Sequence, residues 1–233
     1  MQGKVVVITG GGRGIGRAVC RRFASEGAKV VAAARSADQL AETKAIIEGE
    51  GGSCVVRQAD VASRDEVASL MEFAVEACGG IDVLINNAGM APNTPIDACD
   101  LDVFDAMDGV NIRGVFYACH AAWPLMRKRD GAVIVNISSV AAFDPFPGFA
   151  AYGASKAFVE ALTRGLAREG KDAGIRVYCV GPGAVDTQML RGPFPDFPDD
   201  QCLQPEDVAE TVWQMTQPGC RYAVGQTLYV AKP

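Results

Sequence analysis

The sequence predicts a single α/β domain whose core is a parallel sheet with right-handed crossover connections. Short runs of β-branched and other apolar residues alternate with longer segments of helical character along the whole chain. Such alternation is typical of strands that are joined through helices. The 233 residues, of which 49% are hydrophobic, suffice for one substantial core. Because no internal repeat, low-complexity tract or linker interrupts the pattern, residues 1–233 are assigned to one domain.

Seven strands are expected, each a short apolar run bounded by glycine or polar residues. They span 4–9, 28–34, 53–58, 81–85, 132–137, 174–180 and 226–230. Helices are expected over 14–26, 38–48, 63–78, 101–129, from 152 to about 171, and over 205–217. The fourth of these helices is interrupted at Asp108-Gly109. Two segments lack a regular pattern: 143–149 is rich in proline, and 188–204 is predicted to form a mobile lid.

Two helix starts carry local signals. Ser63 and Glu66 have the spacing of a capping box at the start of the third helix, in which each side chain bonds the other residue's main chain. Pro205 suits the first turn of the last helix, where a missing N–H costs nothing. Both signals therefore support the predicted helix boundaries.

The first strand runs into a glycine-rich turn with five glycines in seven positions, 10–16. Its pattern is T-G-x-x-x-G-x-G, with glycines at 10, 14 and 16, and not G-x-G-x-x-G. Glycines allow the main chain to approach a pyrophosphate, and the helix that follows directs its positive N-terminus at the phosphate charge. An ordinary βα turn seldom needs so many glycines. The turn therefore predicts a dinucleotide site.

The end of the second strand bears on which dinucleotide binds. A site for NAD usually has an acidic residue there to bind the ribose 2′-hydroxyl. This chain has Ala34, followed by Arg35 and Ser36, and Arg13 lies in the glycine turn. Guanidinium groups can hold a 2′-phosphate in two hydrogen bonds. We therefore expect NADP(H), with a solvated Arg35 at a helix start as the alternative.

A second group of polar residues follows the fifth strand. That strand ends in Ser138-Ser139, and Tyr152 and Lys156 lie one turn apart on the next helix. A hydroxyl, a phenol and an ammonium brought together at one strand end suit proton transfer to a carbonyl or from an alcohol. The pattern predicts a hydride-transfer site, because the glycine turn would supply the hydride carrier.

Composition excludes several other classes. The net charge is −6 with no basic stripe, so a nucleic acid is not an expected partner. No apolar run approaches the ~20 residues that span a bilayer, and no signal-like segment opens the chain, so a cytoplasmic protein without membrane contact is expected. The eight cysteines contain no C-x-x-C pair and His120 is the single histidine, so no metal site is expected. A Ser-His-Asp hydrolase would depend on His120 alone.

Taken together, these residues resemble the short-chain dehydrogenase/reductase family over essentially the whole chain. The nucleotide motif runs from Thr9 to Gly16, and the family's N-N-A-G strand end is found at 86–89. A P-G-x-x-x-T segment lies at 182–187. The family's catalytic tetrad is matched by Asn111, Ser139, Tyr152 and Lys156. Gly181, where the family often has asparagine, and the tail after Leu228, where it often has D-G-G, depart from the pattern.

The resemblance implies a Rossmann-like, doubly wound sheet of seven strands in the order 3-2-1-4-5-6-7 with helices on both faces. It implies that Tyr152 is the general acid or base, that Ser139 rather than Ser138 orients the substrate oxygen, and that Lys156 holds the nicotinamide ribose. Positive charge on Lys156 and on the oxidised nicotinamide would stabilise the phenolate, so both are expected to lower the pKa of Tyr152. The resemblance also implies that Asn111 holds a water that connects Lys156 to solvent. The implied cofactor-binding residues are Gly10, Gly12, Arg13, Gly14, Ile15, Gly16, Arg35, Ser36, Asp60, Val61, Asn87, Ala88, Gly89, Asn111, Tyr152, Lys156, Pro182, Gly183, Val185 and Thr187.

The expected reaction is hydride transfer between NADP(H) and a carbonyl or secondary alcohol with an apolar part. The candidate pocket residues are apolar or aromatic, although some can instead cover the core: Met90, Ala91, Pro92, Phe143, Phe146, Phe149, Met189, Leu190 and Phe194. A 3-oxoacyl-carrier-protein reductase is the alternative; its acidic partner would dock on 127–129 or on Arg164, Arg168 and Lys171. A non-catalytic NADP(H) sensor is the alternative from another class.

The family usually forms tetramers or dimers, so a homotetramer or homodimer is expected here. The resemblance implies contact through the helices that carry Asn111 and Tyr152. Small residues on those helices would permit close approach: Ala118, Ala121, Ala122, Ala157 and Ala161.

Overall fold

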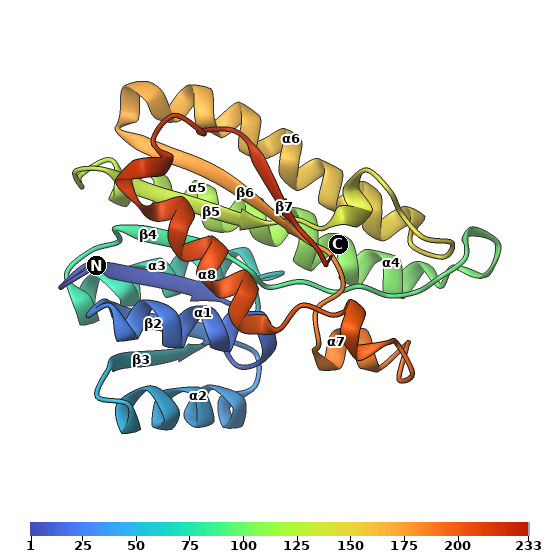
Figure 1. The fold of residues 1–233 in the computed structure, drawn as a ribbon. Helices are drawn as coiled ribbons and strands as arrows, with labels where there is room; N and C mark the ends of the chain where they lie inside the picture. Colours follow the sequence, from blue (N-terminus) through green and yellow to red (C-terminus); the bar gives the residue numbers. More distant parts are fainter. Residues whose placement is uncertain (233) are drawn as a thin grey trace.

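Seven parallel strands form one sheet in the order β3-β2-β1-β4-β5-β6-β7, as the computed structural model of residues 1–232 shows (Figure 1). The strands are β1 (Val5–Thr9), β2 (Lys29–Ala34), β3 (Ser53–Gln58), β4 (Val83–Asn86), β5 (Ala132–Ile137), β6 (Ile175–Pro182) and β7 (Thr227–Val230). The predicted order is confirmed. The chain reverses direction across the sheet between β1 and β4, which opens a crevice at the carboxyl ends of these strands.

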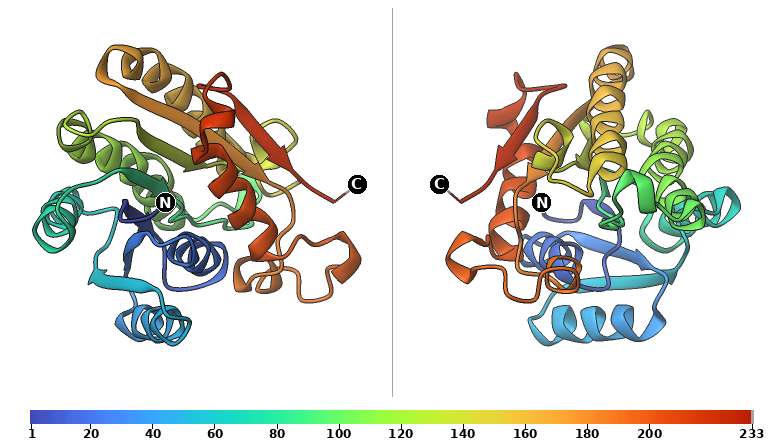
Figure 2. Two further views of the ribbon diagram at one scale, coloured as in Figure 1. Left: turned by 60° about the vertical axis from the view of Figure 1, so that its left-hand side comes forward. Right: turned by 90° about the vertical axis from the view of Figure 1, so that its right-hand side faces the viewer.

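Helices cover both faces of the sheet (Figure 2). One face packs on α1 (Gly14–Ser25), α2 (Ala37–Gly49) and α8 (Pro205–Thr216), and the other on α3 (Arg64–Cys78), α5 (Val115–Met126) and α6 (Ala150–Ala173). The strands supply alternate residues to the two cores: Val6 and Ile8 face the first set of helices, and Val5 and Val7 face the second. Burial on both faces explains why the strands read as continuous apolar runs.

The predicted helix over 101–129 is three segments. It comprises α4 (Leu101–Asp108), a π-helical stretch (Gly109–Gly114) and α5, which ends at Met126. Gly114 lies so close to β3's following loop that an added Cβ would be 2.9 Å from a methyl of Val61. The wider turn of the π-helix places Asn111 in a fully buried position.

The capping box expected at α3 forms only in part. The Ser63 hydroxyl accepts the Glu66 N–H at 3.3 Å, as predicted. The Glu66 carboxylate instead accepts the N–H of Asp60 at 2.9 Å, three residues further back. Glu66 therefore fixes the loop at the end of β3 rather than the cap residue itself.

The segment 188–204 contains more regular structure than expected. It opens with the short helix α7 (Gln188–Arg191). Arg191 donates to Asp186 at 2.8 Å and to the carbonyl of Phe197 at 2.5 Å, and it also pairs with Asp199. One guanidinium thus ties both ends of this segment together.

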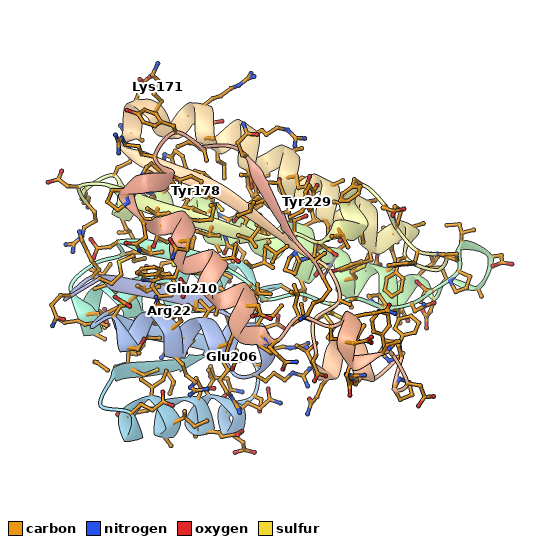
Figure 3. The ribbon with its side chains drawn as sticks, viewed as in Figure 1. Arg22, Lys171, Tyr178, Glu206, Glu210 and Tyr229 are labelled. Atoms are coloured by element: carbon orange, nitrogen blue, oxygen red, sulfur yellow. The ribbon has the colours of Figure 1, made fainter. Side chains whose placement is uncertain are left out.

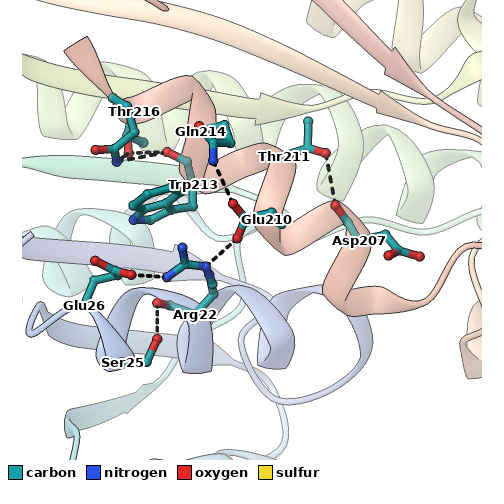
Figure 4. Close-up of polar contacts among 10 residues, drawn as sticks. Arg22, Ser25, Glu26, Asp207, Glu210, Thr211, Trp213, Gln214 and Thr216 are labelled. Atoms are coloured by element: carbon teal, nitrogen blue, oxygen red, sulfur yellow. Dashed lines mark hydrogen bonds and ion pairs between the residues drawn. The ribbon is translucent and has the colours of Figure 1, made fainter. Parts of the chain in front are cut away.

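Helix α8 is fixed on α1 through Arg22 (Figure 4). The guanidinium donates to Glu210 at 2.6 Å and to Glu26 at 2.5 Å, and it lies 4.0 Å from the centre of the Trp213 ring. This contact holds the C-terminal part of the chain against the glycine-turn helix. Among residues 1–232, no helix combines the length and apolar character that a bilayer crossing requires.

Candidate functional site

A cleft of about 1410 Å³ lies at the carboxyl ends of the strands. Its walls come from the glycine turn, the ends of β2 to β6, the start of α6 and the segment 186–201. All the predicted cofactor residues except Asn111 line it, and so does Ser139. Single-ligand pockets have volumes of about 300–1,000 Å³, so this cleft has room for two molecules together.

The glycine turn is shaped for close approach of a ligand. Gly10 and Gly14 have φ angles of +68° and +52°, which favour glycine. A Cβ on Gly16 would lie 2.0 Å from the carbonyl oxygen of Gly10, so no side chain fits there. Helix α1 begins at Gly14 without a side-chain cap, and Gly14, Ile15 and Gly16 of its first turn line the cleft. This cradle suits a pyrophosphate, so the residues present fit a dinucleotide.

Asn87 braces this turn. Its amide donates to the carbonyls of Thr9 at 3.0 Å and Gly10 at 3.2 Å, and its own N–H donates to the Thr9 hydroxyl at 3.1 Å. The same hydroxyl accepts the N–H of Ala88 at 3.2 Å. The end of β4 therefore holds the end of β1 in place.

At the adenosine end of the cleft, Ala34 closes β2 and the exposed Arg35 follows. Ser36 caps α2 by accepting the N–H of Gln39 at 3.3 Å, so its hydroxyl also serves the fold. Arg13 donates to Gln188 at the start of α7. Sequence reasoning missed Gln39 and Gln188, which also line the cleft, because neither belongs to a motif.

The structure brings Ser139 and Tyr152 together at the end of β5. The Ser139 hydroxyl lies beside the phenol of Tyr152, whose pKa it lowers, and it accepts the N–H of Ala141 at 3.2 Å. The neighbouring Ser138 turns inward, to Glu160 at 2.9 Å and the carbonyl of Lys156 at 3.2 Å. Of the two serines, Ser139 therefore has the hydroxyl beside the candidate acid.

Lys156 is buried beneath this pair. Its Nζ donates to the carbonyl of Ile137 at 2.9 Å and lies 5.7 Å from the centre of the Tyr152 ring. Burial lowers the pKa of Lys156 to about 8. Burial also raises the pKa of Tyr152, although the adjacent Ser139 hydroxyl opposes this. The Lys156 ammonium is directed at the carbonyl of Ile137, so the expectation that it lowers the pKa of Tyr152 together with the oxidised nicotinamide stays a prediction.

Asn111 lies behind the cleft and not in its wall. Its side-chain oxygen accepts the N–H of Met90 at 2.8 Å, and its amide donates to the carbonyl of Met90 at 2.8 Å and to Ser155 at 3.0 Å. Both amide hydrogens are thus used within the protein. The observed role of the side chain is to hold the loop after β4 against α6.

On the substrate side, seven of the nine predicted pocket residues line the cleft, and Pro92 and Phe143 do not. Phe143 instead packs edge-on against Tyr229, 4.7 Å between ring centres. Phe149 lies 5.7 Å from Tyr152 and 6.0 Å from Phe194, so an apolar wall adjoins the phenol. Sequence reasoning missed several lining residues from loops and from the C-terminal tail: Asn93, Pro147, Pro193, Phe197, Ala231 and Lys232.

One of the two predicted carrier-protein docks lies away from the cleft. Arg164, Arg168 and Lys171 border a separate hollow of about 710 Å³ beside the start of β6. Figure 3 shows Lys171 at the end of α6 remote from α7. At about 3.3 Å per residue, the length of β6 separates this hollow from the cleft.

The small residues expected at a subunit contact do not share one outer face. Ala118 and Ala122 are fully buried in the chain's own core, against α3 and the sheet. The outer face of α5 instead presents Phe116 and His120, whose rings stack 6.2 Å apart. These two alanines therefore cannot mediate helix contact between subunits.

The sequence model of the short chain dehydrogenase family matches residues 4–196, which is most of the chain. The chain belongs to the short-chain dehydrogenase family. A relative named 3beta-hydroxysteroid dehydrogenase 1, from Eggerthella lenta, is 40% identical over 99% of this chain and 93% of its own. The protein is therefore an oxidoreductase of a family that acts on alcohols and ketones.

Solved structures of this family superpose closely. A short chain dehydrogenase from Burkholderia cenocepacia in complex with NADP is 36% identical, with a TM-score of 0.91 over 98% of this chain and 96% of that one. A 7 alpha-hydroxysteroid dehydrogenase complexed with NADH and 7-oxo glycochenodeoxycholic acid is 30% identical, with a TM-score of 0.93 over 99% and 94%. Family members thus bind either nicotinamide cofactor. Within residues 1–232, no group of three or more histidine, cysteine or acidic side chains is arranged to hold a metal ion.

Proposed function

We propose that this short-chain dehydrogenase is an NADP(H)-dependent reductase of ketones with an apolar body, reversible as an alcohol dehydrogenase. The observation that carries the proposal is that Ser139, Tyr152 and the buried Lys156 line the same cleft as the glycine turn. Bound NADPH would supply the hydride to the carbonyl carbon. The chain's own residues would supply the proton, the orientation and the dry surroundings.

The preference for NADP(H) rests on charge at the adenosine end of the cleft. Ala34 occupies the position where a carboxylate would bind a ribose 2′-hydroxyl and repel a 2′-phosphate. Arg35 is exposed beside it, and Arg13 borders the same part of the cleft. A guanidinium can bind phosphate through two hydrogen bonds, so either arginine can recognise the 2′-phosphate. The NADP complex of the Burkholderia relative supports this preference.

For carbonyl reduction, Tyr152 would donate the phenolic proton to the substrate oxygen as the hydride reaches carbon. The raised pKa of Tyr152 keeps the phenol protonated in neutral solution, as an acid requires. Ser139 would hydrogen-bond the same substrate oxygen and fix its direction. Lys156, held on Ile137, places positive charge below the phenol and favours the phenolate that remains.

The substrate class follows from the other wall of the cleft. Phe149 and Phe194 adjoin Tyr152, and Met189 and Leu190 come from the segment 188–204, which we propose acts as a lid. A fused-ring ketone, such as an oxosteroid, would cover this apolar surface with few rotatable bonds to restrict. The names of the Eggerthella relative and of the 7 alpha-hydroxysteroid dehydrogenase support this class.

The test is the loss of NADPH absorbance with a panel of oxosteroids, simple cyclic ketones, diketones, quinones and an acetoacetyl thioester, with NADH in parallel. We expect the fastest turnover with an oxosteroid and NADPH. Tyr152→Phe should lose nearly all turnover while binding of NADPH, followed by fluorescence, is retained. Turnover limited to the thioester would favour the carrier-protein reductase, and unchanged activity in Tyr152→Phe would refute the assigned acid.

A sensor that binds NADP(H) without turnover makes a different prediction. Wild type would then bind NADPH and reduce no member of the panel, and Tyr152→Phe would be indistinguishable from it. A sensor does not need Ser139, Tyr152 and a buried Lys156 together in the cleft, so we favour the enzyme.

A further inference from the structure

Tyr229 lies on the C-terminal strand β7 (Figure 3). It contacts the loop that follows Ser139 through Phe143. Its hydroxyl donates to Oε1 of Glu160 at 2.8 Å. Its ring meets that of Phe143 edge-on, with 4.7 Å between centres and 73° between planes. Phe143 closes the turn that Ser139 opens, since its N–H donates to the carbonyl of Val140 at 3.2 Å.

Glu160 is a buried carboxylate that no step of the proposed reaction uses. It is 9% exposed, and its Oε1 also accepts the Ser138 hydroxyl at 2.9 Å. One oxygen therefore receives hydrogen bonds from the residue next to Ser139 and from the C-terminal strand. A buried carboxylate oxygen holds its donors firmly, because leaving its charge without them is costly.

The main chain is shaped around the Tyr229 ring. A Cβ on Gly181 would lie 2.5 Å from Cδ1 of Tyr229, so a side chain at 181 would displace the ring. The strand continues directly into the cleft: the Gly183 N–H donates to the carbonyl of Val230 at 2.8 Å, and Ala231 lines the cleft wall. Whatever anchors Tyr229 therefore also places the tail that borders the substrate.

We propose that Tyr229 is a positioning residue for carbonyl reduction, which holds the Ser139 loop through Glu160 and Phe143 and holds the C-terminal tail as a wall of the substrate site. The inference rests on the proposed reductase function. Tyr229 does not itself line the cleft, so it acts through its neighbours. Its two contacts have separate consequences: the hydroxyl governs the position of Ser139, and the ring governs the loop and tail that surround the substrate.

The hydroxyl is a dependable donor. Burial and the adjacent Glu160 carboxylate raise the pKa of Tyr229 to about 12. The phenol therefore stays protonated throughout any practical assay range, and the bond to Glu160 does not switch with pH.

The test compares substitutions at Tyr229 with a matched control, Leu228→Ala, the adjacent and 43% exposed residue of the same strand. Tyr229→Phe keeps the ring and removes the hydroxyl. Because one charge-assisted hydrogen bond is lost, kcat should fall by about tenfold. The KM for the ketone should stay within about twofold of the wild-type value. Tyr229→Ala should in addition raise that KM by about tenfold. The dissociation constant of NADPH should be unchanged in all three variants.

Substitutions at Glu160 test the carboxylate's role separately. Both donors reach the same oxygen, so Glu160→Gln can still accept both and should retain kcat within about threefold. Glu160→Leu removes the acceptor of the Tyr229 hydroxyl and leaves Ser138 only the carbonyl of Lys156, so it should lower kcat as Tyr229→Phe does. Equal loss in Gln and Leu variants would overturn the role given to Oε1.

Hydrogen exchange of the free protein gives a readout that needs no substrate. Tyr229→Phe and Tyr229→Ala should speed exchange of the amides in 140–149, and Leu228→Ala should not. Unchanged exchange there, or wild-type kcat and KM in both Tyr229 variants, would overturn the inference even where wild type reduces the panel. Wild type that reduces no carbonyl would instead refute the proposed function, and the exchange result would still decide whether Tyr229 orders the loop.

Discussion

Raising the pH through 8 should switch off carbonyl reduction, because Lys156 then loses its charge. The structure gives the reason for so low a value. Lys156 is 4% exposed, its Nζ is bonded to the neutral carbonyl of Ile137, and no carboxylate forms an ion pair with it within residues 1–232. Burial without a counter-ion lowers its pKa from 10.5 to about 8.

The magnitude follows directly from this value. The kcat/KM for the ketone should be level below about pH 7 and should fall by about tenfold per pH unit above pH 8. Tyr152 does not contribute to this fall, because its pKa is raised by burial above the ordinary value of 10.0. The assay is the initial rate of NADPH oxidation at saturating NADPH over about pH 6–10. This range lies on both sides of the Lys156 pKa of about 8.

Lys156→Arg provides the control, because arginine keeps its charge over this range. Whatever activity the variant retains should show no fall near pH 8. A fall at the same pH in wild type and Lys156→Arg would refute the assignment to Lys156.

A measurement of stability tests the same pKa of Lys156 and does not require catalytic activity. The folded pKa is lower than the unfolded one, so between about pH 8 and pH 10.5 the unfolded chain binds more protons. Stability must therefore gain from Lys156 as the pH rises through that window. The melting temperature of wild type relative to Lys156→Met should increase there, and a constant difference would contradict the burial argument.

Three further predictions concern other parts of the molecule. Arg35→Ser should weaken NADPH binding by about tenfold or more and leave NADH binding unchanged. Titration of the variant with each cofactor measures both affinities. Equal losses of affinity for both cofactors would exclude binding of the 2′-phosphate by Arg35. Gly16→Ala should abolish NADPH binding, since the new Cβ would meet the Gly10 carbonyl at 2.0 Å; retained affinity in the same titration would contradict the cradle. Asp82→Asn should lower the free energy of unfolding by about 2 kcal/mol, because it breaks a bidentate pair at 3.0 Å between buried Asp82 and the partly exposed Arg129. Its melting temperature should fall by about 4–8 °C at pH 7, and the difference should shrink as acid protonates wild-type Asp82, whose pKa is lowered by these bonds against the effect of burial.

Local sequence patterns determined much of the fold and much of the site's content. The alternation of apolar runs and helical segments predicted all seven strands, and the resemblance gave their order. The glycine turn, Ser139, Tyr152 and Lys156 were found from spacing, because these residues act through neighbours along the chain or through strand ends that the topology brings together. All four features border one cleft.

Tertiary packing decided what spacing does not contain. The direction of Lys156 toward Ile137, and hence the pKa of both Lys156 and Tyr152, depends on burial and on which carbonyl is nearest. Burial of Ala118 against the chain's own core was also invisible in a helix that reads as apolar all round. Each of these properties depends on atoms far apart in the sequence.

The C-terminal tail is the clearest case. In the sequence, Gly181 and Tyr229 are two separate departures from the family pattern, far apart along the chain. The structure places the Tyr229 ring where a Cβ at 181 would be, and brings its hydroxyl to Glu160. The sequence determines which side chains are present and which strands carry them. The pairing of β7 with β6 brings Gly181 and Tyr229 together, because these two residues are partners in the strand register.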